Sequence, residues 1–288
     1  MINSIKEITK CVELMDKQLR NDLFVKNGVL QEKKLWKNTY IKHQLNKRNE
    51  GGTFTINDHI RAMVYSMLSS GIVWERVEKG IDILTGRINP IDDIFHNYDV
   101  DYILQCNPDQ LADEIKNLGC ASQSTRKQMK AIVSKNINKL ISYEKEFSSI
   151  DSYYKKFIEQ DNTLKLLVKQ LADSKSENKF DEMAEALIAE YLKNVGYDIA
   201  KPDRHIRRIL GSKILGCSEY EEVPVNEAFD IVAEIAQEMN KPVAEVDYIL
   251  WSYCANGYGE ICTKDNPKCF ICVAKQYCNK KEISNNGI

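Results

Sequence analysis

Several patterns that would place this chain in a common class are missing from it. No uninterrupted apolar run approaches the roughly 20 residues that a membrane-spanning helix needs, so neither such a helix nor a membrane partner is expected. Alternation of apolar and polar residues is rare and β-branched runs are short, so a β-sheet is not expected. No glycine-rich nucleotide loop, internal repeat or low-complexity segment is visible. What remains is an ordinary globular chain.

The chain also has little net charge. Its 288 residues carry a formal charge of −2, with 43% hydrophobic and 28% charged residues, which is typical of one or two globular domains. This balance does not by itself indicate nucleic-acid binding, but the basic residues are clustered. Each cluster alone is typical of a solvated helix face, whereas four together favour a basic groove. The clusters cover residues 33–48, 126–139, 201–213 and 264–280.

An export signal is not recognised either. The first residues, MINSIKEITKCVELM, have an amphipathic pattern rather than that of a signal peptide. Nine cysteines in such a chain indicate a reducing compartment, where thiols bind metal or stay free instead of forming disulfides. We therefore expect a cytoplasmic protein.

Apolar residues recur at helical spacing along most of the chain. The clearest stripe runs over residues 180–195, and another covers residues 56–68. Thr55 and Asp58 are predicted to form the capping box of the second stripe. These patterns predict an all-α fold. Further helices are expected over residues 74–85, 107–119, 123–143, 226–239 and 242–253, and two more over residues 1–50 with a break near Gly28.

Four of the cysteines lie close together near the end of the sequence. Cys262, Cys269, Cys272 and Cys278 are separated by six, two and five residues in the segment CTKDNPKCFICVAKQYC. The residues between them are polar and lysine-rich, with a turn expected at 266–267, so the segment is a poor hydrophobic core. Four thiolates at this spacing predict a soft metal centre, either an iron–sulfur cluster or a structural zinc ion.

A second motif lies about sixty residues before the cysteines. The segment GYDIAKPDRHIRRILG, residues 196–211, leads from the end of an apolar helix to Asp203, which opens the next helix. Aspartate is a preferred N-cap residue, so from Asp203 alone a capping role is the simpler interpretation. The distance to the cysteines gives the aspartate a second interpretation.

Together the two motifs resemble the endonuclease III-like helix–hairpin–helix (HhH-GPD) superfamily of DNA glycosylases, over roughly residues 53–278. The resemblance implies that the cysteines bind a 4Fe-4S cluster and that Asp203 is the catalytic carboxylate. It implies two helical lobes, a six-helix-barrel-like HhH-GPD domain over residues 52–197 and an iron–sulfur cluster domain over residues 1–51 plus 198–288, with a DNA-binding groove between them. The implied partner is double-stranded DNA that contains a lesion or modified base, so we expect a nucleoid-associated protein that acts as a monomer.

Base excision explains why a carboxylate would be needed. The target base must be flipped out of the stack, and the N-glycosidic bond breaks through a transition state that resembles an oxocarbenium ion. A carboxylate beside the sugar stabilises this positive charge and can orient the attacking water. The basic residues that we predict to contact DNA are Arg126, Lys127, Lys130, Lys201, Arg204, Arg207, Lys264 and Lys268.

Two departures from the family narrow the implied function. The family hairpin usually reads Leu-Pro-Gly-x-Gly, and its glycines let backbone amides approach a DNA phosphate. The matching residues here, 179–183, read KFDEM and include no glycine. Bifunctional members carry a lysine that attacks the sugar as a Schiff-base nucleophile, and Glu185 stands at that position, counting back from Asp203. We therefore expect a monofunctional glycosylase, a hydrolase of N-glycosyl bonds.

The substrate pocket is predicted from the same comparison. Thymine-glycol and adenine glycosylases usually carry a glutamine where Ser69 and its neighbours stand. The adenine enzymes also have a glutamate where Tyr65 stands, so adenine excision is not expected. The residues expected to line the pocket are Tyr65, Ser69, Trp74 and Glu185.

Two further interpretations stay open at this point. The glycine-less hairpin favours a DNA-binding relative that kept Asp203 but lost excision, and a bifunctional glycosylase/AP lyase is the other enzymatic alternative. A redox protein is the least favoured, because no nucleotide-binding loop is visible. Abasic-site formation on lesion duplexes would separate excision from binding alone.

Overall fold

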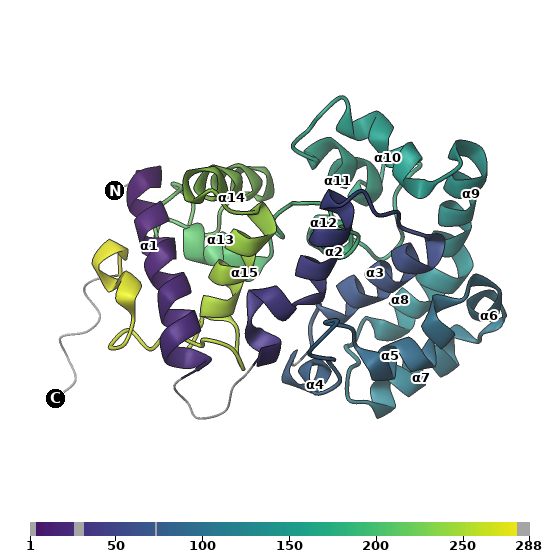
Figure 1. Ribbon diagram of the computed structural model, residues 1–288, viewed down its shortest axis with the longest axis horizontal. Coiled ribbons are helices and arrows are strands. Elements are labelled where there is room, and N and C mark those ends of the chain that lie inside the picture. Colours follow the sequence, from purple (N-terminus) through teal and green to yellow (C-terminus); the bar gives the residue numbers. More distant parts are fainter. Residues whose placement is uncertain (1–3, 26–31, 73, 281–288) are drawn as a thin grey trace. The chain divides into compact units, whose positions relative to one another are not determined.

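The computed structural model describes residues 4–25, 32–72 and 74–280, and this part of the chain is helical (Figure 1). Within these residues there is no β-strand, and one isolated antiparallel bridge joins Ile81 to Ile88. This confirms the predicted all-α class. None of the helices described is both long and apolar enough to cross a membrane.

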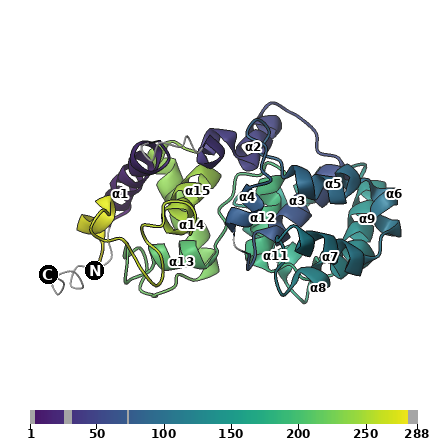
Figure 2. The ribbon, with the colours of Figure 1, turned by 90° about the horizontal axis from the view of Figure 1, so that it is seen from below.

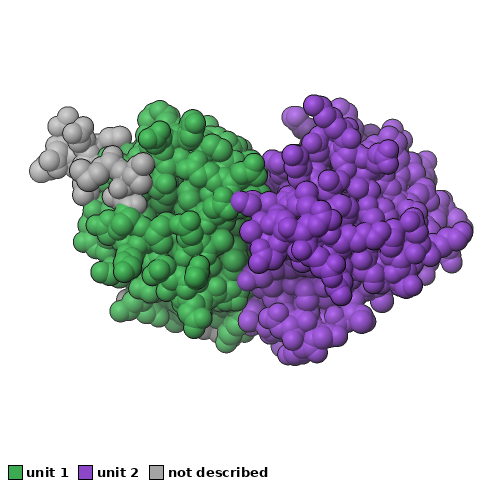
Figure 3. Space-filling model, turned by 90° about the horizontal axis from the view of Figure 1, so that it is seen from above, with its two compact units in different colours: residues 1–37, 200–288 green, residues 38–199 purple. Residues whose placement is uncertain are grey.

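The chain divides into two compact units (Figure 3). Unit 1 consists of residues 1–37 and 200–288, and unit 2 of residues 38–199. The boundary lies between residues 37 and 38, about one helix before the expected one after residue 51, and α2 (Tyr40–Asn49) packs against α12 (Glu185–Asn194) in unit 2. Gly196, with φ +78°, permits this packing, since a Cβ atom there would lie 2.4 Å from the carbonyl oxygen of Gln44.

Unit 1 is assembled from both ends of the sequence. Its first helix, α1, packs against α14, α15 and η6 (Figure 2). Ser4 and Glu7 form a capping box at the start of α1, and the buried face of the helix carries Ile8, Val12 and Met15. The helices of unit 1 are α1 (Ile5–Gln18), the π-helical turn η1 (Leu19–Leu23), the 3₁₀ turn η2 (Glu32–Lys34), α13 (Arg204–Leu210), α14 (Val225–Met239), α15 (Val243–Cys254) and the 3₁₀ turn η6 (Val273–Tyr277).

Unit 2 is built around α3, which packs against α12, α9 and α8. The 3₁₀ turn η3 (Trp36–Asn38) spans the boundary between the units. The helices of unit 2 are α2, α3 (Ile56–Leu68), α4 (Trp74–Glu78), α5 (Asn89–Ile94), the 3₁₀ turn η4 (His96–Tyr98), α6 (Val100–Gln105), α7 (Pro108–Asn117), α8 (Thr125–Ala131), the π-helical turn η5 (Ile132–Asn136), α9 (Ile137–Phe147), α10 (Ile150–Ile158), α11 (Lys165–Ala172) and α12.

Most helix boundaries follow the local sequence signals. The capping box of Thr55 and Asp58 at α3 is confirmed, and the side chain of Asn107 caps α7 as expected. The expected helix over residues 180–195 is shorter, because Phe180 and Met183 are buried in a turn that precedes α12. The helix expected over residues 74–85 ends at Glu78. The break expected near Gly28 lies outside the described residues.

A buried polar network joins four helices of unit 2. His59 of α3 is fully buried, and its Nδ1 lies 2.6 Å from the hydroxyl of Tyr191, which lies 2.8 Å from the hydroxyl of Tyr154. On the same side, Arg48 of α2 binds the carboxylate of Asp151 at 3.0 Å. Burial lowers the pKa of His59 to about 4, against the opposing effect of Asp151, so the imidazole is neutral at pH 7.

The first prediction concerns acid stability. Because the pKa of His59 is about 4 in the fold and about 6.5 when unfolded, the unfolded chain binds the extra proton and stability falls as the pH drops from about 6.5 to 4. His59→Gln, which keeps a hydrogen-bonding group but cannot titrate, should lose about 2.5 kcal/mol less of its free energy of unfolding than the wild type between pH 7 and pH 4.5. Urea denaturation at pH 7 and pH 4.5 measures the difference.

The groups that face His59 also titrate or carry charge, so a control is needed. His96→Gln, at an exposed histidine, should leave the pH dependence of unfolding unchanged. Equal acid sensitivity in wild type and His59→Gln would show that His59 does not carry the effect. The facing groups are Lys47, Arg48, Asp58 and Asp151.

Candidate functional site

Asp203 is the N-cap of α13, and only one of its carboxylate oxygens takes part in capping. Its Oδ1 accepts hydrogen bonds from the backbone N–H groups of His205 (2.8 Å) and Ile206 (3.2 Å). These bonds satisfy two of the donors that a helix start leaves unpaired. Oδ2 accepts no hydrogen bond from the described residues, and the side chain is half-buried. The cap therefore fixes the carboxylate and leaves one oxygen available to a ligand.

The segment that enters α13 is held by α15. The backbone N–H of Lys201 donates to Oδ1 of Asp247, 2.9 Å away, and Asp247 is buried. The N–H of Asp203 in turn donates to the carbonyl of Lys201 at 2.7 Å, and Pro202 restricts φ between them. The position of Asp203 thus depends on the backbone on both sides of it.

The two residues after Asp203 differ in environment. Arg204 is exposed and forms no ion pair with the residues that the structure describes. His205 is half-buried, and burial lowers its pKa more than the neighbouring Asp203 raises it, so the ring is neutral at pH 7. The cation next to the carboxylate in sequence is therefore Arg204.

The other end of α13 contacts the cysteine segment, residues 262–278, which we call the cysteine loop. Arg208 donates to the carbonyl oxygen of Cys262 and lies 3.8 Å from its Sγ. The pKa of the Cys262 thiol is lowered to about 6, first by a hydrogen bond with Cys254 and then by the charge of Arg208. Cys262 is therefore held as a thiolate near neutral pH.

The rest of the cysteine loop is tied to α1. The side-chain amide of Gln18 donates to the carbonyl of Ile271 at 2.7 Å, and its Oε1 accepts from the hydroxyl of Tyr253 at 2.8 Å. The Tyr253 hydroxyl also lies 3.4 Å from Sγ of Cys272. These bonds join α1, α15 and the loop through side chains that the sequence motifs did not single out.

The chemistry of the donor set fits a soft metal, although the sulfurs are not at ligand distances. Within the described part of the chain, no group of three or more His, Cys, Asp or Glu side chains is arranged to hold a metal ion. Burial nevertheless raises the pKa of Cys278, and the charges of Cys262, Cys272 and Cys269 raise it further, so the four thiols interact electrostatically. One of them is already a thiolate, the form that binds iron or zinc.

The basic residues predicted to contact DNA fall into three groups. Lys127, Arg204 and Lys264 are exposed and unpaired among the described side chains. Lys201 is buried, which contradicts its assignment as a DNA contact. The other four form ion pairs with carboxylates of their own unit, and exposed pairs of this kind are weak. They are Arg126 with Asp109 and Asp113, Lys130 with Asp109, Arg207 with Glu222, and Lys268 with Glu260.

Two of the four predicted pocket residues are engaged inside unit 2. Tyr65 is 4% exposed, donates to Asp92 and accepts from the N–H of Ile88, both at 2.7 Å, so its placement in an open pocket is wrong. Ser69 is the C-cap of α3, and its hydroxyl donates to the carbonyl of Ser66 at 2.6 Å.

The other two predicted pocket residues begin helices. Trp74 is half-buried at the start of α4. Glu185 is half-buried at the first position of α12 and forms no hydrogen bond or ion pair with described side chains. Glu185 is the residue that the sequence resemblance matched to the lysine of bifunctional glycosylases.

The hairpin that leads from α11 to α12 is closed by internal hydrogen bonds. The side chain of Asn136 donates to the carbonyl of Asp181 (3.1 Å) and accepts from its N–H (2.9 Å). The N–H of Met183 donates to the carbonyl of Phe180 at 3.4 Å. Asp181 and Met183 stand at the two positions where the sequence resemblance led us to expect glycines, and both backbone N–H groups are engaged within unit 2.

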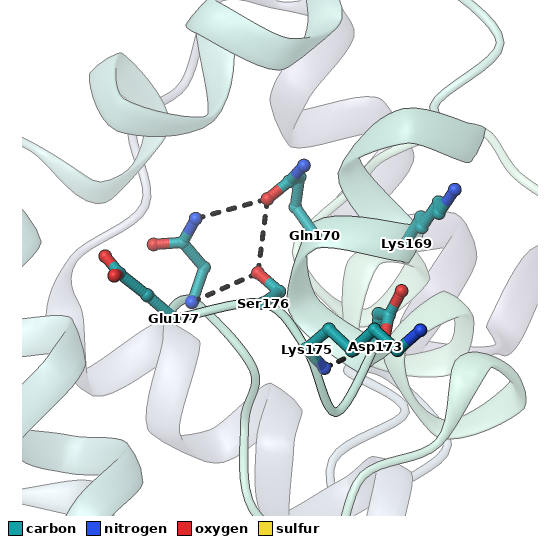
Figure 4. Close-up of a pocket in the computed structure, with 7 residues that line it drawn as sticks. Lys169, Gln170, Asp173, Lys175, Ser176 and Glu177 are labelled. Atoms are coloured by element: carbon teal, nitrogen blue, oxygen red, sulfur yellow. Dashed lines mark hydrogen bonds between the residues drawn. The ribbon is translucent and has the colours of Figure 1, made fainter.

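A shallow polar pocket of about 340 Å³ lies over the first half of this hairpin (Figure 4). Gln170 accepts hydrogen bonds from the hydroxyl of Ser176 (3.2 Å) and the side-chain amide of Asn178 (3.3 Å). The pocket has no aromatic lining residue and contains none of the residues predicted for the substrate pocket. We therefore attribute it to the turn rather than to a site.

Comparisons with known proteins support the fold. No protein-family model matches the sequence, and no curated protein matches it significantly. The 8-oxoguanine DNA glycosylase of Methanocaldococcus jannaschii is similar in structure, with a TM-score of 0.51 and 18% identity over 86% of this chain and 96% of that one. Its 8-oxoguanine glycosylase/lyase complex with a 15mer DNA containing 8-oxoguanine gives a TM-score of 0.48 at 19% identity, over 83% and 96%. At this identity the likeness shows a shared fold.

The second prediction separates capping from charge at Asp203. Asp203→Ala removes the acceptor for two backbone amides and should lower the free energy of unfolding by about 1 kcal/mol. Asp203→Asn retains an oxygen acceptor and should stay within a few tenths of a kcal/mol of wild type, at about the same thermal midpoint. Thermal unfolding of the three proteins measures both. If the alanine variant is as stable as the wild type, the cap contributes nothing.

Proposed function

We propose that this protein is a DNA glycosylase that removes a damaged, modified or mispaired base. The observation that carries the proposal is the carboxylate of Asp203, held by its capping bonds through one oxygen while the other accepts no hydrogen bond within the described chain. Its position at the start of α13, after an apolar helix and a short connection, resembles that of the family carboxylate. The fold shared with a DNA glycosylase supports the same reading.

The chemistry follows from what a fixed carboxylate can do next to a sugar. Cleavage of the N-glycosidic bond places positive charge on C1′ and the ring oxygen, and Oδ2 of Asp203 would stabilise that charge. The same oxygen can orient a water molecule for attack on C1′. Because the cap already orders the carboxylate, little reorganisation is needed when the charge develops. The exposed Arg204 next to it suits a DNA phosphate.

The reaction that we propose is hydrolysis without a lyase step. A lyase of this family needs an amine that forms an imine with the sugar, and Glu185 stands where that lysine is expected. The archaeal protein of similar structure is named a glycosylase/lyase, and that name applies to it alone. 8-Oxoguanine is nevertheless the first base to test, beside mispaired, alkylated and oxidised bases.

A DNA-binding relative without excision is the second candidate. The engaged amides of Asp181 and Met183 favour it, because they remove a phosphate contact that the family uses. The exposed Glu182 also adds negative charge at the turn, which repels a phosphate, while Asp181 is paired with Lys135 at 2.6 Å. Binding would then rest on the exposed Lys127, Arg204 and Lys264.

We further propose that Cys262, Cys269, Cys272 and Cys278 bind a 4Fe-4S cluster with a structural role. The spacing of these residues and the thiolate character of Cys262 support this. A bound cluster would supply rigid thiolate cross-links within the loop. Through the contact of Arg208 with Cys262, an ordered loop would also hold the C-terminal end of α13.

The third prediction is the outcome of excision. The wild type should convert lesion duplexes to intact abasic strands that break only after alkali, and borohydride should trap no protein–DNA adduct. Asp203→Asn should keep the fold and most of the DNA affinity, while single-turnover excision falls by about 100-fold or more. Denaturing gels with and without alkali measure both.

Two controls make this experiment decisive. Glu185→Lys introduces an amine at the position of the lysine in bifunctional members. Borohydride trapping of this variant would show that Glu185 is correctly matched to that lysine. Trapping of the wild type would show that another lysine is the nucleophile and that the protein is a lyase. An Asp203→Asn variant with undiminished excision would reduce Asp203 to a helix cap.

The fourth prediction concerns the metal. Protein purified without air should be brown, absorb near roughly 400 nm and contain about four iron atoms per chain, as a 4Fe-4S protein does. Cys262→Ser and Cys278→Ser should each lose most of the iron, whereas Cys106→Ser, at a cysteine of unit 2, should not. If metal analysis instead finds stoichiometric zinc and no iron, the four cysteines bind a structural zinc ion and the proposed cluster is wrong.

A further inference from the structure

We propose that Phe270, in the cysteine loop, is an aromatic contact to bound DNA, packing against the bases or deoxyriboses of the duplex. The inference rests on the proposed function, because it assumes that DNA is the partner. It adds an apolar contact to a binding surface that basic residues alone would otherwise form.

Phe270 is unusual in its exposure. It is 85% exposed, more than any other large hydrophobic side chain in the described part of the protein. Ile271 beside it is 38% exposed. An exposed phenylalanine next to a second partly exposed apolar residue leaves apolar surface in water, which favours contact with a partner.

The backbone under Phe270 is fixed. The N–H of Ile271 donates to the carbonyl of Lys268 at 3.2 Å, which closes a turn with Cys269 and Phe270 at its two corners. The carbonyl of Ile271 accepts from the side chain of Gln18 at 2.7 Å, so α1 anchors the end of the turn. A side chain presented by an anchored turn loses little entropy when it binds, which makes it a suitable wedge or stacking group.

The charge around Phe270 selects nucleic acid as the partner. Lys264, Lys275 and Lys280 are exposed and have no carboxylate partner among the described residues, while Asp265 is the one acidic residue between positions 262 and 280. An aromatic side chain among unpaired cations is the combination that binds nucleic acids, through stacking and phosphate neutralisation together. Lysine is by contrast depleted from interfaces between proteins.

Tyr220 provides a contrast within the same unit. It is 60% exposed and stands in the sequence Glu219-Tyr220-Glu221-Glu222. Its exposure resembles that of Phe270, but its sequence neighbours are acidic, and the cations that reach them, Lys213 and Arg207, are already paired with Glu221 and Glu222. Tyr220 is therefore the matched control for an exposed aromatic residue that should not contact DNA.

The test is the affinity of full-length variants for a labelled duplex that carries a tetrahydrofuran abasic analogue, measured by fluorescence anisotropy at several salt concentrations. Phe270→Ala should weaken binding by about 5- to 50-fold, because one aromatic contact is lost. The slope of log K against log salt should not change, since no phosphate contact is removed. Phe270→Trp should bind within about 2-fold of wild type, and Phe270→Glu more weakly than the alanine variant.

Two controls define the expected pattern. Tyr220→Ala should bind as the wild type does, and Lys264→Ala should reduce the salt slope by about one unit. The thermal midpoint and metal content of the Phe270 variants should match those of the wild type, because the side chain is exposed.

Two results would overturn the inference. The first is wild-type affinity in Phe270→Ala, whatever Phe270→Glu shows, because an added carboxylate repels phosphates even where no aromatic contact exists. The second is a change from dimer to monomer in Phe270→Ala, seen by light scattering, which would make the patch an interface between copies of the chain. If the wild type excises bases and Phe270→Ala binds normally, this inference alone fails. If the wild type shows no salt-dependent DNA binding, the proposed function fails with it.

Discussion

The hydrogen bonds from the amides of His205 and Ile206 to Oδ1 of Asp203 are the interaction on which the candidate site depends. They orient the carboxylate, hold it at the start of α13 and leave Oδ2 without a partner in the described chain. The remaining contacts of unit 1 support this short helix from both ends. Asp247 of α15 fixes the entering backbone, and Arg208 joins the last turn to the cysteine loop. Capping thus uses one carboxylate oxygen and leaves the other for the proposed chemistry.

The anchoring of α13 also gives the cysteine loop a mechanical role. Gln18 of α1 and Tyr253 of α15 bind the cysteine loop, so residues from both ends of the sequence hold the loop in place. The proposed cluster would make the loop more rigid without taking part in the proposed reaction. In unit 2, Asn136 closes the hairpin before α12 and engages the backbone N–H of Asp181. If the protein binds DNA as proposed, phosphate contacts would come from exposed cations such as Arg204 and Lys264.

The sequence predicts much of the fold because helix signals are local. The capping box at Thr55 and the N-cap at Asn107 depend on residues three or fewer positions apart, and both occur in the structure. The start of α12 could not be predicted in this way, since Phe180 and Met183 fit a helical stripe but are buried from a turn that Asn136 holds from 45 residues away. The burial of Tyr65 is similar, because its partners Asp92 and Ile88 come from a later segment.

The site shows the same division between local and distant information. Asp203 and the cysteines were found because their spacing along the chain is itself a signal. Gln18, Asp247 and Asn136 were missed because a polar residue on an apolar helix face does not reveal its partner. Glycine at 196 was recognised as a helix end, but its close approach to Gln44 depends on how α2 packs.

The most direct test of the central claim is the affinity for a charged mimic of the transition state. A duplex with a cationic pyrrolidine in place of the target sugar carries the charge that Oδ2 of Asp203 is proposed to stabilise, and the neutral tetrahydrofuran duplex is its matched reference. The account predicts that the wild type binds the cationic duplex at least about 10-fold more tightly than the neutral one, and that Asp203→Asn binds both equally. Equal affinities in the wild type, or a preference that survives in Asp203→Asn, would contradict the assignment of Asp203 as the catalytic carboxylate.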